Sequence, residues 1–424
     1  MTNPLSWLLG TSSVLLGLGL LWVNHQPDGV RGLYLVILCL AWCAGLFILR
    51  TRLRQINLAT IALAACILRF FGLWTEPFTS HDGLRYLADG AALLEGLNPL
   101  DIPYIEQPLE FRMRWPIFYE HQPYTSIYPP IALGLFAAAA AAGPLYAWWT
   151  WKALGLVVSI SIVFMLRRQA ENCPDVNPLY FWFALHPLVI VETTVAPHID
   201  LFVIVPLLFW LFNRDNRPSS YTALALGIGA LIKPTILLGG LAWMRPLSRR
   251  NVLVGSLLAG VLLCTFLTLR IMGIQAPLGA DFGTFLNGWH FGSLLDTVIF
   301  WYDRPTPGAI RIAFFLFISA LWITRLPKQE PLFYRFGDAL CIALACSPVV
   351  FPWYLLILTP WIVRREFPIV GWWSASLLTY EVLDLFDLDT TWSPSSWPNQ
   401  VTVIILILWA LSRRTNSFML GGPQ

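Results

Sequence analysis

Four ionisable or hydroxyl-bearing side chains in the segment SHDGLRYLADG have the spacing of one face of a helix. Asp82, Arg85, Tyr86 and Asp89 take positions i, i+3, i+4 and i+7 of a helix predicted to start near Ser80. A carboxylate beside an arginine and a second carboxylate suits removal of a proton from a hydroxyl and charge pairing with a phosphate. The same residues also suit a salt-bridged surface helix, with Ser80 as N-cap and Asp82 favourable in the first turn.

This segment belongs to a polar, proline-rich island, residues 75–130, inside an otherwise apolar chain. The island carries ten further ionisable side chains: Glu76, His81, Glu95, Asp101, Glu106, Glu110, Arg112, Arg114, Glu120 and His121. A plain connecting loop does not need so many. We therefore interpret the island as the place where chemistry happens.

The remaining candidate site residues lie in segments that follow the island in sequence. His198 and Asp200 lie two residues apart at a predicted turn, where they either bind a substrate or cap the next helix. Lys233 either meets an anionic group or extends to the lipid headgroups. His186 and Glu192 lie in an apolar run but not on one helical face; each is a functional suspect or a buried polar residue with unrelated partners.

The elements that must position these residues are membrane helices. Of the 424 residues, 57% are apolar and 12% are charged, against about 25% charged in soluble proteins. Runs long enough to cross a bilayer lie at 5–23, 32–49, 58–74, 147–166, 251–269 and 307–324.

The net charge of +3 is too small to indicate binding to nucleic acid. The seven cysteines form no CxxC pair and lie mostly in apolar runs, which indicates buried thiols rather than a metal or redox centre.

Basic clusters give the orientation, because Lys and Arg are enriched in cytoplasmic loops. Placing every cluster inside yields one path, in which the first run is a retained helix and the island is extracytoplasmic. The run 129–143 is then a juxtamembrane or re-entrant helix on the outer face. The run 221–243, broken at Lys233-Pro234, is a hairpin that enters and leaves from the cytoplasm. The clusters are Arg50, Arg52 and Arg54; Arg167 and Arg168; Arg214 and Arg217; Arg245, Arg249 and Arg250; Arg325 and Lys328; Arg364 and Arg365; Arg413 and Arg414.

Further crossings are predicted at 178–194, 199–213, 336–350, 353–363, 368–383 and 399–412. The expected fold class is therefore an all-α polytopic membrane protein with about 11–13 transmembrane helices. Residues 1–424 form a single integral membrane domain, and 75–143 are its large external loop with a juxtamembrane helix. Aromatic and histidine side chains in the predicted external turns either contact substrate or anchor the chain at the interface: Trp289, His290, Trp353 and Tyr354.

The polar motifs follow one another in a distinctive order: HDGLRYLADG, GLNPLDIPY, IYPPIALGLF, HPLVIVETTVAPHIDL, LIKPTILLGG and FPWYLLILTPW. This order, over most of residues 75–365, resembles the glycosyltransferase C superfold in its polyprenyl-phosphate-sugar-dependent, bacterial mannosyltransferase-like branch, similar to glycosyltransferase family 87. That family has an acidic pair, then R-Y-x-x-D-G, G-x-N-P-Y, Y-P-P, N/H-P-L-x-x-x-E, H-x-D, K-P and P-W-Y. No motif is specific alone. His81 replaces the first acid of the pair, and Leu100 replaces the tyrosine after G-x-N-P.

The resemblance implies a membrane glycosyltransferase that moves a hexose, with mannose expected, from a polyprenyl-phosphate sugar to an extracytoplasmic lipid or glycan acceptor, with inversion. Asp82 matches the family's essential aspartate and is the predicted catalytic base. Arg85, His198 and Lys233 are the cations expected to meet the charge that develops on the leaving phosphate. The residues predicted to bind substrate are His81, Arg85, Tyr86, Asp89, Tyr128, His198, Asp200 and Lys233.

The expected partners are the donor, the acceptor and membrane lipids, with no nucleic acid. No cofactor is firmly implied; a divalent metal is compatible with the reaction but has no support in the sequence, because His81 weakens metal capture by the acidic pair. The expected location is a bacterial inner or plasma membrane, crossed many times, with the active site on the extracytoplasmic face. Two rivals are a catalytically inactive subunit that kept the superfold and a lipid or sugar transporter.

Overall fold

The computed structural model describes residues 4–213, 219–244, 249–275, 279–281, 283, 291–300, 308–325, 331–385, 401 and 404. Within them the fold is all-helical, apart from one isolated bridge between Phe291 and Val349. The first helices are α1 (Pro4–Asn24), α2 (Arg31–Arg50), α3 (Leu58–Trp74), α4 (Asp82–Leu94), α5 (Leu109–Arg114), α6 (Pro130–Ala140), α7 (Ala147–Asn172), α8 (Asn177–Leu185) and α9 (Pro187–Ile190). The later helices are η5 (Val191–Val195), α10 (Asp200–Asn213), α11 (Ser219–Ile232), η6 (Pro234–Met244), α12 (Arg249–Ile271), α14 (Leu294–Phe300), α15 (Gly308–Arg325), α16 (Leu332–Cys346), η7 (Pro352–Trp361), α17 (Ile362–Ser376) and α18 (Thr379–Leu385).

Three of the described helices, α1, α2 and α7, are long and apolar enough to cross a membrane. A fourth span results if the two segments Pro174–Leu185 and Pro187–Val195, which meet at 57°, are one bent span. Shorter apolar helices of 10–17 residues accompany them: Leu58–Trp74, Pro130–Ala140, Asp200–Asn213, Ser220–Ile232, Gly255–Ile271 and Ile310–Trp322. The chain is therefore an all-helical membrane protein, as its composition predicts.

The sequence locates the early helices well and several later breaks poorly. The predicted crossing at 353–363 coincides with a ten-residue 3₁₀ helix, Pro352–Trp361, rather than with an α-helix. The predicted crossing at 368–383 is divided at Leu377 between α17 and α18, and that at 178–194 bends where Pro187 starts a new helix. Apolar content alone does not reveal these interruptions. The predicted crossing at 399–412 lies outside the described residues except positions 401 and 404, and Trp289 and His290 lie outside them altogether.

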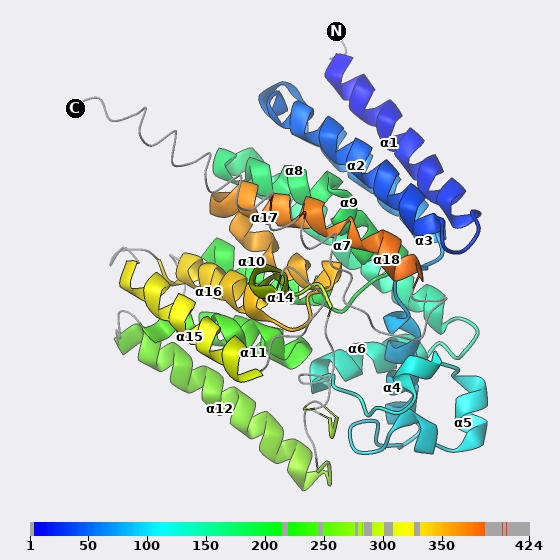
Figure 1. The fold of residues 1–424 in the computed structure, drawn as a ribbon, viewed down its shortest axis with the longest axis vertical. Coiled ribbons are helices and arrows are strands. Elements are labelled where there is room, and N and C mark those ends of the chain that lie inside the picture. Colours follow the sequence, from blue (N-terminus) through cyan, green and yellow to red (C-terminus); the bar gives the residue numbers. More distant parts are fainter. Residues whose placement is uncertain are drawn as a thin grey trace.

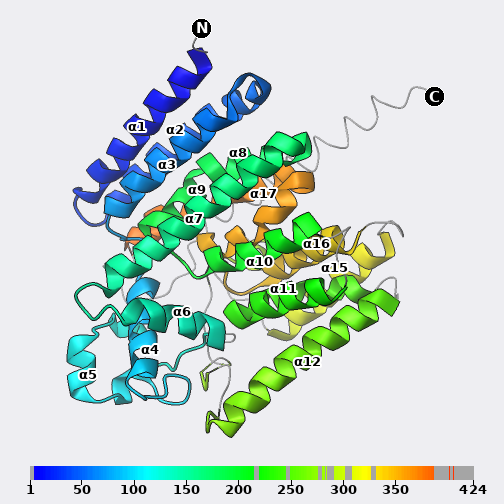
Figure 2. The ribbon, with the colours of Figure 1, turned by 180° about the vertical axis from the view of Figure 1, so that it is seen from behind.

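The polar island and several basic clusters lie at opposite ends of the molecule. Figures 1 and 2 show α4, α5 and α6 together at one end, and the junction of α7 with α8 at the other. There the guanidinium of Arg50 pairs with the carboxylate of Glu366. Asp175 and Arg364 line one surface recess near that junction. Segments beside four of the predicted cytoplasmic clusters therefore meet at the end away from the island.

A close helix crossing fixes the orientation of α4. A Cβ added at Gly90 would lie 2.3 Å from the backbone carbon of Phe136 and 2.5 Å from the backbone nitrogen of Ala137, so only glycine allows α6 to approach this far. One turn away, the rings of Tyr86 and Phe136 stack with centroids 4.4 Å apart. Trp151 of α7 packs edge-on against both rings. These contacts hold the face of α4 that carries Asp82.

Candidate functional site

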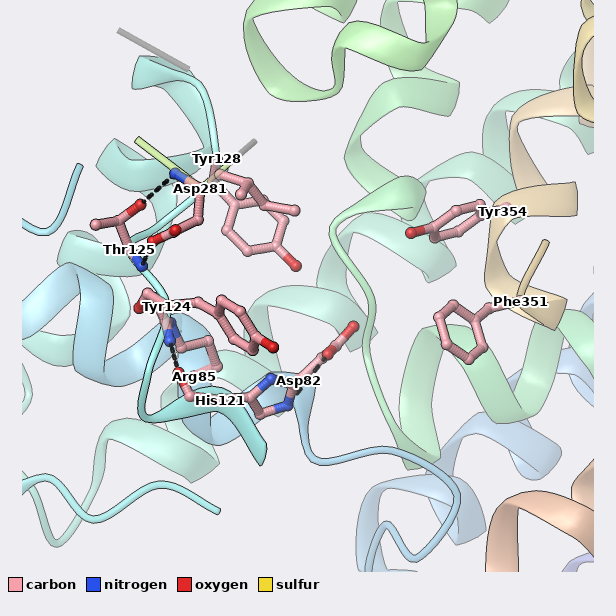
Figure 3. A pocket seen from close by; sticks show the side chains of 10 residues that line it. Asp82, Arg85, His121, Tyr124, Thr125, Tyr128, Asp281, Phe351 and Tyr354 are labelled. Carbon is pink, nitrogen blue, oxygen red and sulfur yellow. Dashed lines mark hydrogen bonds and ion pairs between the residues drawn. The ribbon is translucent and has the colours of Figure 1, made fainter. Parts of the chain in front are cut away.

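A cavity opens between the island and the segment that follows Val350 (Figure 3). Its enclosed volume is about 60 Å³, and the space is about 580 Å³ when the open solvent at its mouth is included. Figure 3 shows the hydroxyls of Tyr128 and Tyr354 and the carboxylate of Asp82 directed toward this space. The lining residues are Asp82, Arg85, His121, Tyr124, Thr125, Ile127, Tyr128, Asp281, Phe351 and Tyr354.

Asp82 is the first residue of α4, and its carboxylate reaches the cavity. Its backbone N–H donates to Ser80 Oγ at 3.2 Å. The predicted N-cap at Ser80 is one residue early, because the N-cap position is His81, whose side chain makes no capping hydrogen bond. Oδ1 lies 3.7 Å from Nε2 of His121, Oδ2 lies 3.9 Å from Nε2 of His198, and the Tyr86 hydroxyl donates to Oδ2 at 3.4 Å. A carboxylate open to a cavity and flanked by two imidazoles has the surroundings of a general base.

His198 is held on three sides. Its Nε2 lies 3.1 Å from Ser80 Oγ, its Nδ1 lies 2.7 Å from Oε2 of Glu192, and its ring stacks on Trp353 with centroids 4.0 Å apart. The other oxygen of Glu192 accepts a hydrogen bond from the Tyr380 hydroxyl. The 2.7 Å contact between Nδ1 and Oε2 is not aligned as a hydrogen bond. Stacking on Trp353 and the backbone hydrogen bond from His198 N–H to the Glu192 carbonyl, at 3.0 Å, orient the ring so that Nε2 faces Ser80 and Asp82.

Lys233 and Asp200 form a buried ion pair behind the cavity wall. The ammonium donates to both carboxylate oxygens, at 2.6 and 2.7 Å, and lies 3.6 Å from the ring centroid of Tyr354. The chain breaks at Lys233 as predicted, because α11 ends at Ile232 and Pro234 begins η6. The alternative in which Lys233 extends to the lipid headgroups does not fit these contacts.

Arg85 and Asp89 fasten the island loop to α4. The Arg85 guanidinium donates from Nε to Asp89 Oδ1 at 2.9 Å and from Nη2 to the carbonyl of Tyr124 at 2.8 Å, and it also donates to the carbonyl of His121. Burial raises the pKa of Asp89 above its ordinary value despite the neighbouring arginine. Both side chains are buried, so the structure gives them a positioning role, and the phosphate-binding role of Arg85 stays a prediction.

His81 does not line this cavity. Its Nδ1 lies 2.6 Å from Oε1 of Glu120, and its ring stacks on Phe118 with centroids 3.3 Å apart. It instead lines a second cavity behind the first turn of α4. Leu100, the other departure from the family pattern, is buried inside the island.

The structure brings most of the predicted residues together. Asp82, Arg85 and Tyr128 line the cavity, and the supporting residues behind them are Tyr86, Asp89, His198, Asp200 and Lys233.

Sequence reasoning missed the roles of other residues. The sequence could have indicated that His121 and Glu192 belong to the site, because both are ionisable residues in segments that contain other candidates. Asp281, whose Oδ2 accepts the backbone N–H of Thr125 at 2.8 Å, is far from the island in sequence, and no sequence pattern indicated its contact with the island. The sequence left open whether Trp353 contacts substrate or anchors the chain at the membrane interface. The structure buries it against His198, which does not fit an interfacial anchor.

Neither a metal-ligand cluster nor a known relative assigns this site. In the described part of the chain, no three His, Cys, Asp or Glu side chains are grouped to hold a metal ion. Comparisons with protein-family models, curated proteins and solved structures find no match for the chain. The function therefore has to be argued from the geometry.

Proposed function

We propose that the protein is a multi-pass membrane glycosyltransferase of the glycosyltransferase C type. It moves a hexose, with mannose the expected sugar, from a polyprenyl-phosphate sugar to a lipid or glycan acceptor. The observation that carries this proposal is convergence: motifs far apart in the sequence contribute to one cavity and the wall behind it. They supply Asp82, Tyr128, His198, Lys233 and Tyr354. Motifs scattered by chance through a chain rich in Trp and Pro have no reason to meet.

The reaction is a single displacement at the anomeric carbon. The acceptor oxygen forms a bond to sugar C1 while the bond from C1 to the phosphate oxygen breaks. The acceptor proton goes to Asp82, and the electron pair of the breaking bond leaves with the lipid phosphate. Attack from the face opposite the leaving group inverts C1, so a β-linked donor gives an α-glycoside.

The leaving phosphate gains negative charge, which donors around the cavity must stabilise. Lys233 provides the nearest ammonium behind Tyr354, and Asp200 holds it in place. Burial lowers the pKa of His121, which outweighs the opposing effect of Asp82, so its imidazole is neutral near pH 7 and acts as a hydrogen-bond donor or acceptor. The hydroxyls of Tyr128 and Tyr354 complete the set.

The proposed site faces the extracytoplasmic side of a bacterial inner or plasma membrane. In support, the island lies at the end of the molecule away from the segments that adjoin the basic clusters (Figure 1). The shorter apolar helices serve as further spans, for a total of about 11–13 passes.

The test is donor turnover by the purified protein in lipid vesicles. Undecaprenyl-phosphate and dolichyl-phosphate sugars are supplied with a membrane-lipid extract as acceptor, and donor consumption is measured. We expect wild type to consume a donor and Asp82→Asn to lose this activity. Asp175→Asn, at an exposed aspartate near the opposite end, is the matched control and retains it. Equal activity of Asp82→Asn would refute the base assignment, and an inactive wild type would favour the non-catalytic subunit or the transporter.

A second candidate, acyl transfer or ester hydrolysis at Ser80, is favoured by one geometry. Ser80 Oγ lies 3.1 Å from Nε2 of His198, and Nδ1 lies 2.7 Å from Oε2 of Glu192, in the order of nucleophile, base and acid found in serine hydrolases, although the second contact is not aligned as a hydrogen bond. Against it, Ser80 Oγ also accepts the N–H of Asp82, a local contact before α4 that needs no reaction. A fluorophosphonate probe decides: labelling that disappears in Ser80→Ala supports the nucleophile, and an unlabelled wild type removes it.

A further inference from the structure

A second cavity lies on the other side of the first turn of α4, against the start of α7. Trp74, Phe118, Trp148 and Trp149 supply aromatic walls, and the space is about 1,050 Å³ including its opening. Ser80, His81 and Gly83 line it, whereas Asp82, between them in sequence, lines the first cavity. Ser80 and His81 precede α4 and Gly83 follows Asp82 in its first turn, so the chain at the start of α4 lines both cavities.

Lys152 places a buried positive charge in this second cavity. The residue is 1% exposed, and its ammonium donates to the carbonyls of Gly72 at 3.2 Å and Thr75 at 2.6 Å, at the end of α3. No carboxylate among the described residues lies within ion-pair distance of it; Glu76 lines the same cavity and acts on Lys152 from a greater distance, and Nζ lies 6.0 Å from the ring centroids of Trp148 and Trp149. An ammonium has three N–H groups, and a buried charge is costly without a counter-ion. Two carbonyls satisfy donors but supply no opposite charge.

The outer rim of the cavity is apolar and faces outward. Phe70, Trp74 and Trp149 are 56%, 54% and 46% exposed, and Leu145 and Tyr146 beside them are 75% and 62% exposed. Exposed Trp and Tyr at the end of a candidate membrane span are typical of the membrane–water interface. An occupant that satisfies both Lys152 and this rim needs an anionic group joined to an apolar body.

We propose that the second cavity binds a lipid whose headgroup carries a phosphate, and that this lipid is the acceptor of the transfer; the second half of the inference rests on the proposed function. The phosphate pairs with Lys152, the acyl chains lie along the aromatic rim, and a headgroup hydroxyl extends past Ser80 toward Asp82.

The test measures binding without any sugar donor. Purified protein in detergent is titrated with dioctanoyl phosphatidylglycerol and, for comparison, with dioctanoylglycerol, which lacks the phosphate; native mass spectrometry gives the occupancy. We expect one phosphatidylglycerol to bind at least tenfold more tightly than dioctanoylglycerol. Lys152→Gln should weaken it at least tenfold, and Lys152→Arg should retain it. Arg167→Gln, which removes a partly exposed arginine paired with Glu171 at the other end of α7, is the matched control and binds as wild type.

A second variant keeps the test decisive if Lys152→Gln fails to fold, since Lys152 also caps α3. Trp149→Ala truncates a half-exposed ring, leaves no large void, and should also weaken phosphatidylglycerol binding. The proposed site is refuted if both variants bind phosphatidylglycerol as tightly as wild type does. It is also refuted if wild type binds dioctanoylglycerol as tightly as phosphatidylglycerol.

Two further outcomes separate the alternatives. Displacement by inorganic phosphate at a similar concentration overturns the lipid in favour of a free anion. Lipid binding by a wild type that consumes no sugar donor refutes the proposed function but not the lipid site. Donor consumption without lipid binding refutes only this inference.

Discussion

At the residue scale, two aspartates on one face of α4 have different environments and therefore different roles. Asp89 is 3% exposed and bound by Arg85, and burial raises its pKa. The side chain of Asp82 is 21% exposed, opens into the cavity and has imidazoles within 4 Å. A base must reach its substrate, so the accessible carboxylate is the better candidate. The spacing of the motif shows both aspartates but does not distinguish them.

The two aspartates should respond differently to the same amide substitution. Asp82→Asn should lower the transfer rate by about 10²–10⁴-fold with little change in thermal stability, because it removes a proton acceptor. Asp89→Asn should lower the stability by about 3–5 kcal/mol, because it leaves the Arg85 charge buried without its partner. Donor turnover and thermal unfolding in detergent, measured on both variants, check this. The reverse assignment would follow if Asp89→Asn were the stable, inactive variant.

His121 should make the fold sensitive to acid. Burial holds its folded pKa below the ordinary 6.5. As the pH falls below about 6.5, the unfolded chain therefore takes up a proton that the folded chain refuses, so stability decreases until the folded pKa is reached. The charges of Asp82, Arg85 and Glu120 surround this imidazole and stay in place in the variant.

The measurement is the change in apparent melting temperature between about pH 7.5 and pH 5.5. His121→Gln should show a smaller decrease than wild type. His25→Gln, at an exposed histidine after α1, should show the wild-type decrease. If His121→Gln were as acid-sensitive as wild type, other groups would account for the effect.

At the element scale, local signals were predictable and contacts between distant segments were not. The helical spacing from Asp82 to Asp89 predicts α4, although its N-cap is His81 rather than Ser80, and the break at Lys233 follows from the next residue being a proline. The contacts of His198 with Glu192, and of His121 with Asp82, depend on how η5 and the island loop fold back on α4. No pattern within one segment encodes such a path.

The crossing of α4 and α6 gives a matched pair of glycines. Gly90→Ala should destabilise the protein and lower transfer, because its Cβ would meet the α6 backbone at 2.3 Å and push the two helices apart. Gly134, on α6, has nothing within 4 Å of an added Cβ, so Gly134→Ala should stabilise the protein by about 1 kcal/mol. Thermal unfolding of the two variants tests this. Equal effects would show that α4 and α6 do not pack in this way.

At the scale of the whole molecule, chemistry and charge are divided between two ends. The polar island, both cavities and the aromatic rim lie around α4 and the start of α7, whereas Arg50, Glu366 and Arg364 lie at the other end. Composition and charge clustering predict this division from sequence. They do not predict that the island folds into a packed unit, since that depends on buried residues such as Leu100 and Tyr104.

This division predicts that the native Cys173 and a cysteine introduced at position 106 are labelled from opposite sides of the cell membrane. Cys173 is exposed at the end of α7 beside a basic cluster, and Glu106 is exposed in the island. Cys264, also exposed, is first replaced by serine. A membrane-impermeant maleimide should then label Cys173 only after the cells are permeabilised. Glu106→Cys, with Cys173 also replaced, should be labelled in intact cells, because the basic clusters stay in the cytoplasm. Labelling of Glu106→Cys only after permeabilisation would place the island in the cytoplasm, where an extracytoplasmic transfer reaction could not occur.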